Sequence, residues 1–265
     1  MAQDHTLMAS RYELKYLIPN HVAWRVRAFI QQHLELDEFC VGMPKLSYPI
    51  HSLYLDSDDE KIFWHGNNGN KNRYKLRIRY YNDSPKTPIF WEVKRRMKDV
   101  ILKQRCGIKR PHAYKVINGL MPTREEMIAP DDPSEIKAIQ DFFQLQFSLN
   151  ASGKMDVAYD REAYVSAHNN EFRVTFDRNV RVCPRTDQLL TTKMENIFQC
   201  TGEGFDPDDV VILELKFTER FPNFYRDLVR SFDLMQTGAA KFMEGTLMYQ
   251  GQQLDAPDVV RNMVL

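Results

Sequence analysis

The sequence is poor in the features that would place it outside the cell or within a membrane. Its four cysteines are scattered without a C-x-x-C pair, which argues against a zinc site or a disulfide framework. No stretch reaches the ~18 apolar residues of a membrane-spanning helix, and residues 1–10 contain no apolar signal core. These absences predict a cytoplasmic protein with no membrane segment.

Net charge is also lacking. Lys and Arg together number 36, as do Asp and Glu, so the formal net charge is zero. Nucleic-acid-binding domains usually carry an excess of positive charge, so no nucleic-acid partner is expected. The oligomeric state is left open.

Two familiar enzyme signatures are missing. The loop 66–70 lacks the G-x-x-x-x-G-K-[ST] spacing and does not join a strand to a helix, so it is not interpreted as a phosphate-binding loop. No Ser/His/Asp arrangement suggests a nucleophile, and His51, His65 and His112 are interpreted as ordinary surface or core residues.

The positive charge that is present is concentrated in one part of the chain. From Arg73 to Arg110 there are thirteen Lys and Arg against three acids, a net charge of +10. The rest of the chain must therefore sum to −10. This segregation predicts a local anion site in a neutral protein.

Within that part, residues 73–81 alternate strictly. The basic residues Arg73, Lys75, Arg77 and Arg79 are separated by apolar or aromatic ones. Alternation predicts a β-strand with an apolar face and a row of cations about 7 Å apart. Such a row repels itself, so it needs either an anionic ligand or water along it.

Other segments show the same alternation, and amphipathic stretches lie between them. Strands are predicted at residues 11–18, 48–56, 73–81, 89–97, 101–110, 154–166, 171–182 and 210–217. Tight turns are predicted at 98–99 and 169–170. Helices are predicted from Pro19 to about Leu34 and at residues 56–65, 111–120, 135–147 and 222–232.

These patterns predict an α+β fold, a closed eight-stranded antiparallel β-barrel, or tunnel, with helices packed outside. The apolar strand faces would lie under the helices, and closure would remove the sheet edges. Residues 1–265 are predicted to form one domain with a core at about 10–248. A mostly cationic interior suits a polyanion together with a divalent metal ion.

Three Glu-x-Lys pairs support that interior. Glu13, Glu92 and Glu214 each precede a lysine by two residues, and on a strand these two positions share a face. Each pair offers a carboxylate for Mg²⁺ or Mn²⁺ beside a cation for phosphate. The alternative interpretation is a set of salt bridges across the interior with no ligand.

Several short motifs, in order, resemble a known family. They are similar to those of the polyphosphate polymerase domain of the vacuolar transporter chaperone (VTC) complex, in the triphosphate tunnel metalloenzyme, or CYTH-like, superfamily. The resemblance covers roughly residues 10–248. Its motifs here are Glu13-x-Lys15, Lys75-x-Arg77-x-Arg79, Glu92-x-Lys94, Tyr159-x-Arg161, Arg173-x-Thr-x-Asp177, Glu214-x-Lys216 and Ala240-Lys241-Phe242.

The resemblance implies that the γ-phosphoryl group of ATP is transferred onto polyphosphate, with Mn²⁺ or Mg²⁺ as cofactor and ATP and polyphosphate as partners. The phosphate-holding catalytic residues would be Lys15, Arg77, Arg79, Lys94, Arg161, Arg173 and Lys241. Further phosphate contacts would come from Lys75, Lys109 and Lys216. Glu214 would be the principal metal ligand, with Glu13 and Glu92 as further candidates.

One position departs from the superfamily. Its Glu-x-Glu-x-Lys hallmark has Arg11 at the first place in this sequence, which resembles the polymerase branch more than the hydrolases. Two alternatives stay open: a metal-dependent triphosphatase on the same fold, and a non-catalytic module that binds polyphosphate or RNA. The RNA interpretation is weakened because the aromatic residues of 73–81 would face outward, towards the covering helices.

Overall fold

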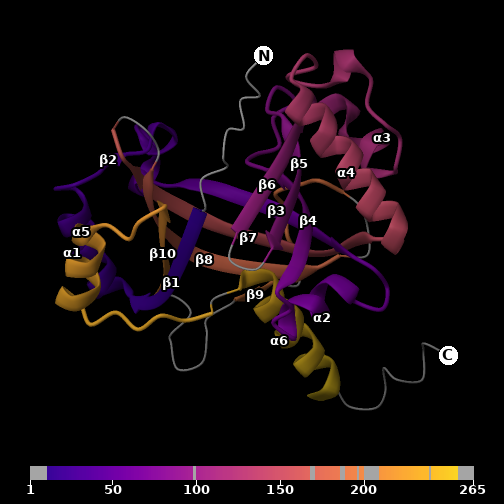
Figure 1. The fold of residues 1–265 in the computed structure, drawn as a ribbon. Coiled ribbons are helices and arrows are strands. Elements are labelled where there is room, and N and C mark those ends of the chain that lie inside the picture. Colours follow the sequence, from indigo (N-terminus) through magenta and orange to yellow (C-terminus); the bar gives the residue numbers. More distant parts are fainter. Residues whose placement is uncertain are drawn as a thin grey trace.

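The computed structural model of this chain describes residues 11–97, 100–167, 171–185, 189–195, 197–199, 209–238 and 240–255. The two predicted turns, at 98–99 and 169–170, lie outside these residues. Elements are labelled as in Figure 1.

The strands form one antiparallel sheet in the order β1-β10-β8-β7-β3-β4-β5-β6. Two short strands lie beside this path, β2 on β7 and β9 on β8. The α+β class and the antiparallel sheet predicted from the sequence are confirmed. The strand bounds are β1 (Arg11–Pro19), β2 (Glu35–Leu36), β3 (Tyr48–Asp56), β4 (Asn72–Tyr80), β5 (Ile89–Met97), β6 (Val100–Ile108), β7 (Ser152–Val165), β8 (Phe172–Pro184), β9 (Phe198–Gln199) and β10 (Val210–Thr218).

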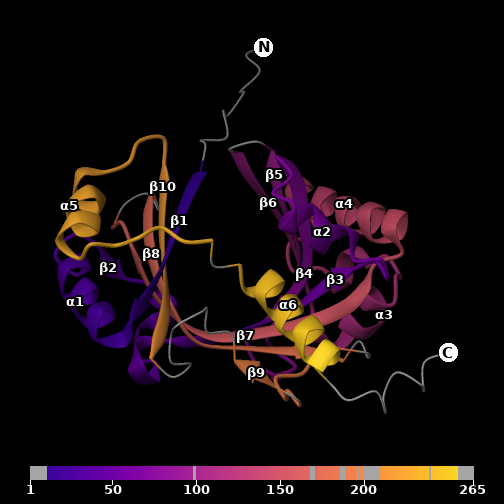
Figure 2. The ribbon, with the colours of Figure 1, turned by 90° about the horizontal axis from the view of Figure 1, so that it is seen from below.

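The predicted closed barrel is wrong. Strands β1 and β6 are the two ends of the sheet, and within the described part of the chain no ladder joins them. Figure 2 shows the sheet bent into two arms, with β1 facing β5 and β6 across the opening. An ion pair nevertheless connects the two arms across the opening, because Lys94 Nζ on β5 lies 3.1 Å from Glu13 Oε2 on β1. Alternation predicts which face of a strand is charged, but it does not encode whether the first and last strands pair.

Helices cover the outer face of both arms (Figure 2). Helices α1 and α5 lie outside the first arm, formed by β1, β10 and β8, while α3 and α4 lie outside the second arm, formed by β3 to β6. The helix bounds are α1 (Asn20–Ile30), α2 (Lys61–Asn67), α3 (Ala113–Ile117), α4 (Pro133–Leu149), α5 (Asn223–Ser231) and α6 (Lys241–Asp255).

Each arm buries its apolar strand face under its own helices. In the second arm, Ile78 and Trp91 are fully buried in one cluster with Phe142 of α4. In the first arm, Leu215 of β10 is buried with Val26 of α1. The prediction of apolar faces directed outward to covering helices is confirmed for these strands, so the opposite, charged faces line the concave side.

Helix α6 departs from the prediction that all helices pack outside. Its first turn lies on the concave side, where the Phe242 ring stacks on Tyr54 with centroids 4.9 Å apart. Gly245 permits this close approach, because a Cβ atom there would lie 2.7 Å from the side chain of Val182 on β8. The helix therefore closes part of the concave side and carries Lys241 into it.

The helix start predicted after β3 is anchored by its aspartate. The Asp56 carboxylate accepts hydrogen bonds of 2.8 Å from the backbone amides of Ile62 and Phe63, so it holds the first turn of α2. The helix itself begins later than predicted, at Lys61.

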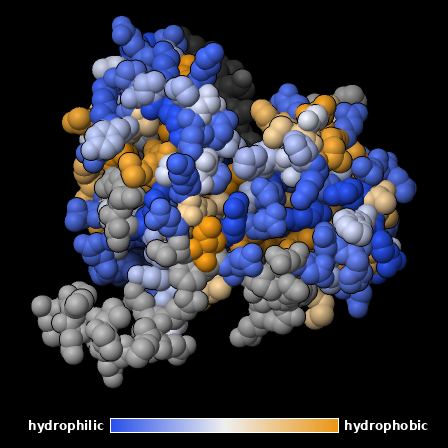
Figure 3. All heavy atoms as spheres, turned by 180° about the vertical axis from the view of Figure 1, so that it is seen from behind, coloured by the Kyte–Doolittle hydropathy of each residue, from blue (hydrophilic) through white to orange (hydrophobic). Residues whose placement is uncertain are grey.

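The surface shows no extended apolar belt on the face that Figure 3 presents, where apolar side chains form small groups among hydrophilic ones. None of the helices in the described ranges is both long enough and apolar enough to cross a membrane.

Candidate functional site

A cavity of about 1520 Å³ occupies the concave side and is lined from both arms and from α6. Among the described residues that line it, thirteen are Lys or Arg and two are Glu. The cations are Lys15, Arg73, Lys75, Arg77, Arg79, Lys94, Arg96, Lys103, Arg105, Arg161, Arg173, Lys216 and Lys241, and the acids are Glu13 and Glu214. The row of cations on β4 thus forms one wall of a strongly cationic chamber.

Glu92 organises that wall from behind. Its fully buried carboxylate contacts Arg77 at 2.6 Å, Lys103 at 2.9 Å and Arg105 at 3.3 Å. Burial alone would raise the pKa of Glu92, but Arg77, Arg79 and Lys103 hold it well below its usual range. Glu92 is not one of the described residues that line the cavity. It therefore orients guanidinium groups and is poorly placed to reach a metal ion.

Glu214 organises the opposite wall. Its carboxylate lies 2.7 Å from Lys216, 3.3 Å from Lys241, 3.4 Å from Arg161 and 3.5 Å from Lys15. Burial would raise the pKa of Glu214, yet these cations keep it well below normal. One carboxylate therefore gathers four cations that the sequence separates widely.

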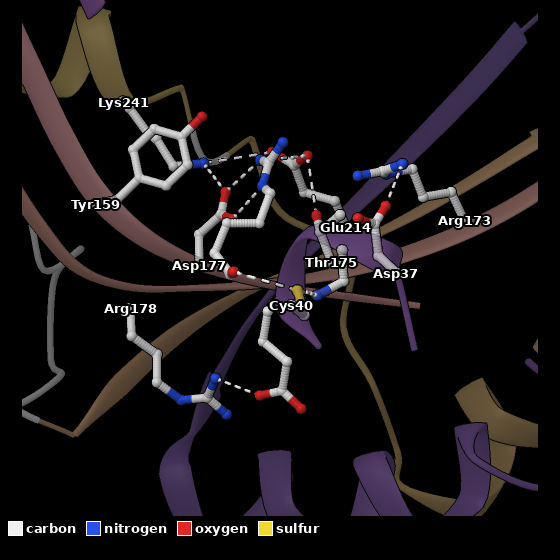
Figure 4. A network of polar contacts seen from close by, with 12 residues as sticks. Asp37, Cys40, Tyr159, Arg173, Thr175, Asp177, Arg178, Glu214 and Lys241 are labelled. Atoms are coloured by element: carbon white, nitrogen blue, oxygen red, sulfur yellow. Dashed lines mark hydrogen bonds and ion pairs between the residues drawn. The ribbon is translucent and has the colours of Figure 1, made fainter. Parts of the chain in front are cut away.

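The buried Asp177 holds two cations of this wall, Arg161 and Lys241, in position (Figure 4). Its carboxylate accepts two 2.7 Å hydrogen bonds from Arg161 and lies 2.6 Å from Lys241 Nζ. The same ammonium lies 4.7 Å from the ring centroid of Tyr159. Asp177 is not among the site residues predicted from the sequence, although it shares a strand face with Arg173, four residues earlier in the same motif.

The remaining cations that line the cavity differ in whether an acidic side chain lies close to them. Lys15 lies 3.4 Å from Glu13, and Arg173 lies 2.9 Å from Asp37. Lys75 has no acidic partner among the residues that the structure describes, and its ladder neighbour is Lys94. Burial, together with Lys15, Lys94 and Arg77, lowers the pKa of Lys75 to about 8.

The same excess of positive charge affects the pKa of Tyr54. Its hydroxyl accepts a 3.3 Å hydrogen bond from Arg77. Burial would raise the pKa of Tyr54, but Arg77, Lys75 and Arg79 lower it to about 7. The chamber as described is short of negative charge and suits a polyanion.

Lys109 is not brought to this chamber. Strand β6 ends at Ile108, and the alternation that put Lys109 in phase with Arg105 ends there. The exposed Lys109 ammonium instead donates a 2.6 Å hydrogen bond to the backbone oxygen of Glu125. The structure brings together the other predicted phosphate-holding cations and two of the three predicted metal ligands.

Glu13 and Glu214 are the carboxylates best placed for a metal ion. Both line the cavity, and the Lys15 ammonium contacts both, at 3.4 and 3.5 Å. The described part of the chain contains no group of three His, Cys, Asp or Glu residues that could hold a metal by itself. Two carboxylates nevertheless suit the usual coordination of Mg²⁺, which binds one or two protein carboxylates and completes its coordination shell with phosphate oxygens and water.

Comparison with protein families matches residues 10–249 of the chain to the VTC domain. The chain belongs to the VTC domain family. The match spans nearly the whole chain, including both arms, the cavity and the first half of α6. The family resemblance predicted from the motifs is confirmed.

Two solved structures resemble this VTC domain at low sequence identity. A provisionally named adenylate cyclase from Bacillus halodurans has 11% identity and a TM-score of 0.48, covering 87% of this chain and 95% of its own. Another from Vibrio parahaemolyticus has 12% identity and a TM-score of 0.42, covering 94% and 99%. Likeness of this degree does not bear on the activity of the present chain. Comparison with curated protein sequences finds no significant match.

Proposed function

We propose that this VTC domain is a metal-dependent polyphosphate polymerase that transfers the γ-phosphoryl group of ATP to the end of a polyphosphate chain. The observation that carries the proposal is the cavity, where thirteen cations face two carboxylates and Lys75 has no acidic partner among the described residues. A polyphosphate chain and a nucleoside triphosphate both supply the missing negative charge.

The reaction needs little covalent help from the protein. A terminal phosphate oxygen of the acceptor chain attacks the γ-phosphorus, the bond to the β-phosphate oxygen breaks, and ADP leaves. The protein must hold the three groups in line and neutralise charge on the transferred oxygens. Arg77, Arg79 and Arg161 offer planar forks for this purpose, and Glu92 and Asp177 orient them.

Glu13 and Glu214 would hold Mn²⁺ or Mg²⁺ on the opposite wall. When bound there, the ion would neutralise phosphate oxygens. Lys15 lies 3.4 Å from Glu13 and 3.5 Å from Glu214, and Lys216 lies 2.7 Å from Glu214. Both lysines are therefore placed to contact phosphate beside the metal.

The activity test uses purified protein with ATP, a short polyphosphate primer and Mn²⁺ or Mg²⁺. Long polyphosphate on a gel, with an equivalent amount of ADP, is the expected result. Release of inorganic phosphate without chain growth would overturn the proposal in favour of a triphosphatase. Binding of polyphosphate without turnover would favour a non-catalytic module.

Arg77→Ala is expected to lower the rate of chain growth by about 10²-fold or more, because a guanidinium aimed at developing charge is lost. Arg77→Lys keeps the charge beside Glu92 but removes the fork, so its loss should be smaller. Arg124→Ala, at an exposed arginine on the outer surface, is the matched control and should leave the rate unchanged. An unchanged rate in Arg77→Ala would remove the β4 wall from the mechanism.

A further inference from the structure

One end of the cavity is lined by a continuous row of aromatic rings. Phe39, Tyr48, Tyr81 and Phe90 follow one another with ring centroids 6.2, 6.2 and 6.1 Å apart. All four line the same cavity as the phosphate-facing arginines. We call these four residues the aromatic row. A phosphate chain has no flat apolar group that could stack on these rings. A ligand that is only polyphosphate therefore leaves the aromatic row unexplained.

An arginine stacks on the last ring of the row. The guanidinium carbon of Arg105 lies 3.4 Å from the ring centroid of Phe90, and its terminal nitrogen donates a 3.3 Å hydrogen bond to the Tyr81 hydroxyl. Aromatic faces beside a guanidinium plane are the surfaces on which nucleobases stack, and stacking tolerates any base because each has a π-face.

Phe39 is exposed on a backbone that is held in place. It belongs to a short 3₁₀ helix, η1 (Glu38–Cys40), and its amide donates a 3.0 Å hydrogen bond to Asp37. The other Asp37 oxygen lies 2.9 Å from Arg173. On the far side, the buried Cys40 sulfur accepts a hydrogen bond from the backbone amide of Ala163 at 3.4 Å. Phe39, which is 66% exposed, is therefore held at the cavity by the same carboxylate that positions Arg173.

The row lies at a defined end of the cavity. Tyr48 and Tyr54 sit at opposite ends of β3, about 20 Å apart at the usual strand rise. Tyr54 stacks on α6, whereas Tyr48 pairs with Arg161 across the β3–β7 ladder and Phe90 pairs with Arg79 across β4–β5. The aromatic row therefore adjoins the arginines, and α6 lies towards the other end of β3.

We propose that the aromatic row stacks the base of the nucleoside triphosphate. This inference rests on the proposed function, in which ATP enters this cavity. With its base on the row, the nucleotide lies with its γ-phosphate deepest, among Arg77, Arg79 and Arg161. Because attack must be in line with the leaving group, the acceptor chain approaches from the side of Tyr54 and α6. The row thus sets the direction in which the chain is fed through the cavity.

The test is Phe39→Ala, measured by calorimetric binding of two ligands: a non-hydrolysable ATP analogue with a β,γ-imido bridge, and inorganic tripolyphosphate. The variant should bind the ATP analogue about tenfold more weakly, corresponding to ~1.4 kcal/mol of lost stacking, and bind tripolyphosphate as the wild type does. Phe39→Trp should bind the analogue as tightly as the wild type or more tightly. Phe147→Ala, at a phenylalanine of similar exposure on α4, is the matched control and should change neither ligand.

The outcomes separate the two proposals. If the wild type binds tripolyphosphate and Phe39→Ala weakens both ligands equally or neither, the stacking inference is overturned and the proposed function stands. If the wild type binds neither ligand, the proposed function fails and the inference fails with it. Phe39 is exposed, so its replacement should leave the fold intact, and equal melting temperatures of variant and wild type would verify this.

Discussion

Lys75 shows at the scale of one residue what the cavity lacks. Its neighbours Lys15, Lys94 and Arg77 all repel its charge, and burial adds to their effect, so its pKa falls to about 8. An ammonium with a lowered pKa holds its proton below that value and loses it as the pH rises. A bound phosphate would supply the missing opposite charge and raise the pKa again. Ligand binding should therefore be coupled to proton uptake at mildly alkaline pH.

Lys75→Arg should remove that coupling, because the guanidinium keeps its charge throughout this range. Relative to the variant, wild-type affinity for tripolyphosphate should weaken by up to about tenfold between pH 7 and pH 9. The measurement is a binding titration at several pH values with one ligand, so ionisation of the phosphate itself affects both proteins equally. Parallel pH profiles would show that Lys75 does not meet the phosphate.

At the scale of an element, the packing of α6 affects both the stability of the fold and the position of Lys241 in the cavity. The helix rests on Val182 through Gly245, and its first turn delivers Lys241 to Asp177 and Glu214. The contact is close enough that one added methyl group has nowhere to go. The position of Lys241 thus depends on a glycine one helical turn away.

Gly245→Ala should lower both the melting temperature and the affinity for tripolyphosphate, since the added Cβ would lie 2.7 Å from Val182 and push the helix away from β8. Gly251→Ala is the matched control in the same helix, where a Cβ meets nothing within 4 Å. There the better helix propensity of alanine should stabilise the protein by up to ~1 kcal/mol and leave binding unchanged. Equal effects of the two substitutions on stability would contradict the close α6–β8 packing.

At the scale of the whole molecule, two arms that each have their own covered core face each other across a chamber of like charge. Side chains such as the Lys94–Glu13 ion pair connect the two arms across the opening, with no backbone ladder between β1 and β6 in the described ranges. The cations repel one another across the chamber, so the folded state holds unrelieved electrostatic energy until an anion enters. A polyanion that bridges both walls should therefore stabilise the molecule.

Tripolyphosphate at a hundred times its dissociation constant should raise the free energy of unfolding by about 2.7 kcal/mol. The corresponding rise in melting temperature is roughly 5 to 10 °C for a domain of this size. Thermal melting with and without the ligand measures it, and sodium chloride at matched ionic strength is the control. If chloride stabilises the protein as much as tripolyphosphate does, general screening would account for the effect, and no specific polyanion site would be needed.

The sequence by itself determined which face is charged in strands such as β1, β4 and β10. A strand repeats every two residues, so the alternation in segments such as 73–81 follows directly from backbone geometry and needs no tertiary contact. For the same reason the amphipathic helices could be placed outside the apolar faces, and the cations of β4 could be assigned to one wall.

Only the tertiary structure decided how those faces meet, because pairing and burial depend on residues far apart in the chain. Local periodicity carries no information on whether β1 meets β6, and the edges stay open. The three Glu-x-Lys pairs look alike in sequence, yet Glu92 is enclosed by cations while Glu13 and Glu214 face the cavity. Phe39 lines the same cavity as Arg173, and Asp37, which bonds the Phe39 amide, is paired with that arginine.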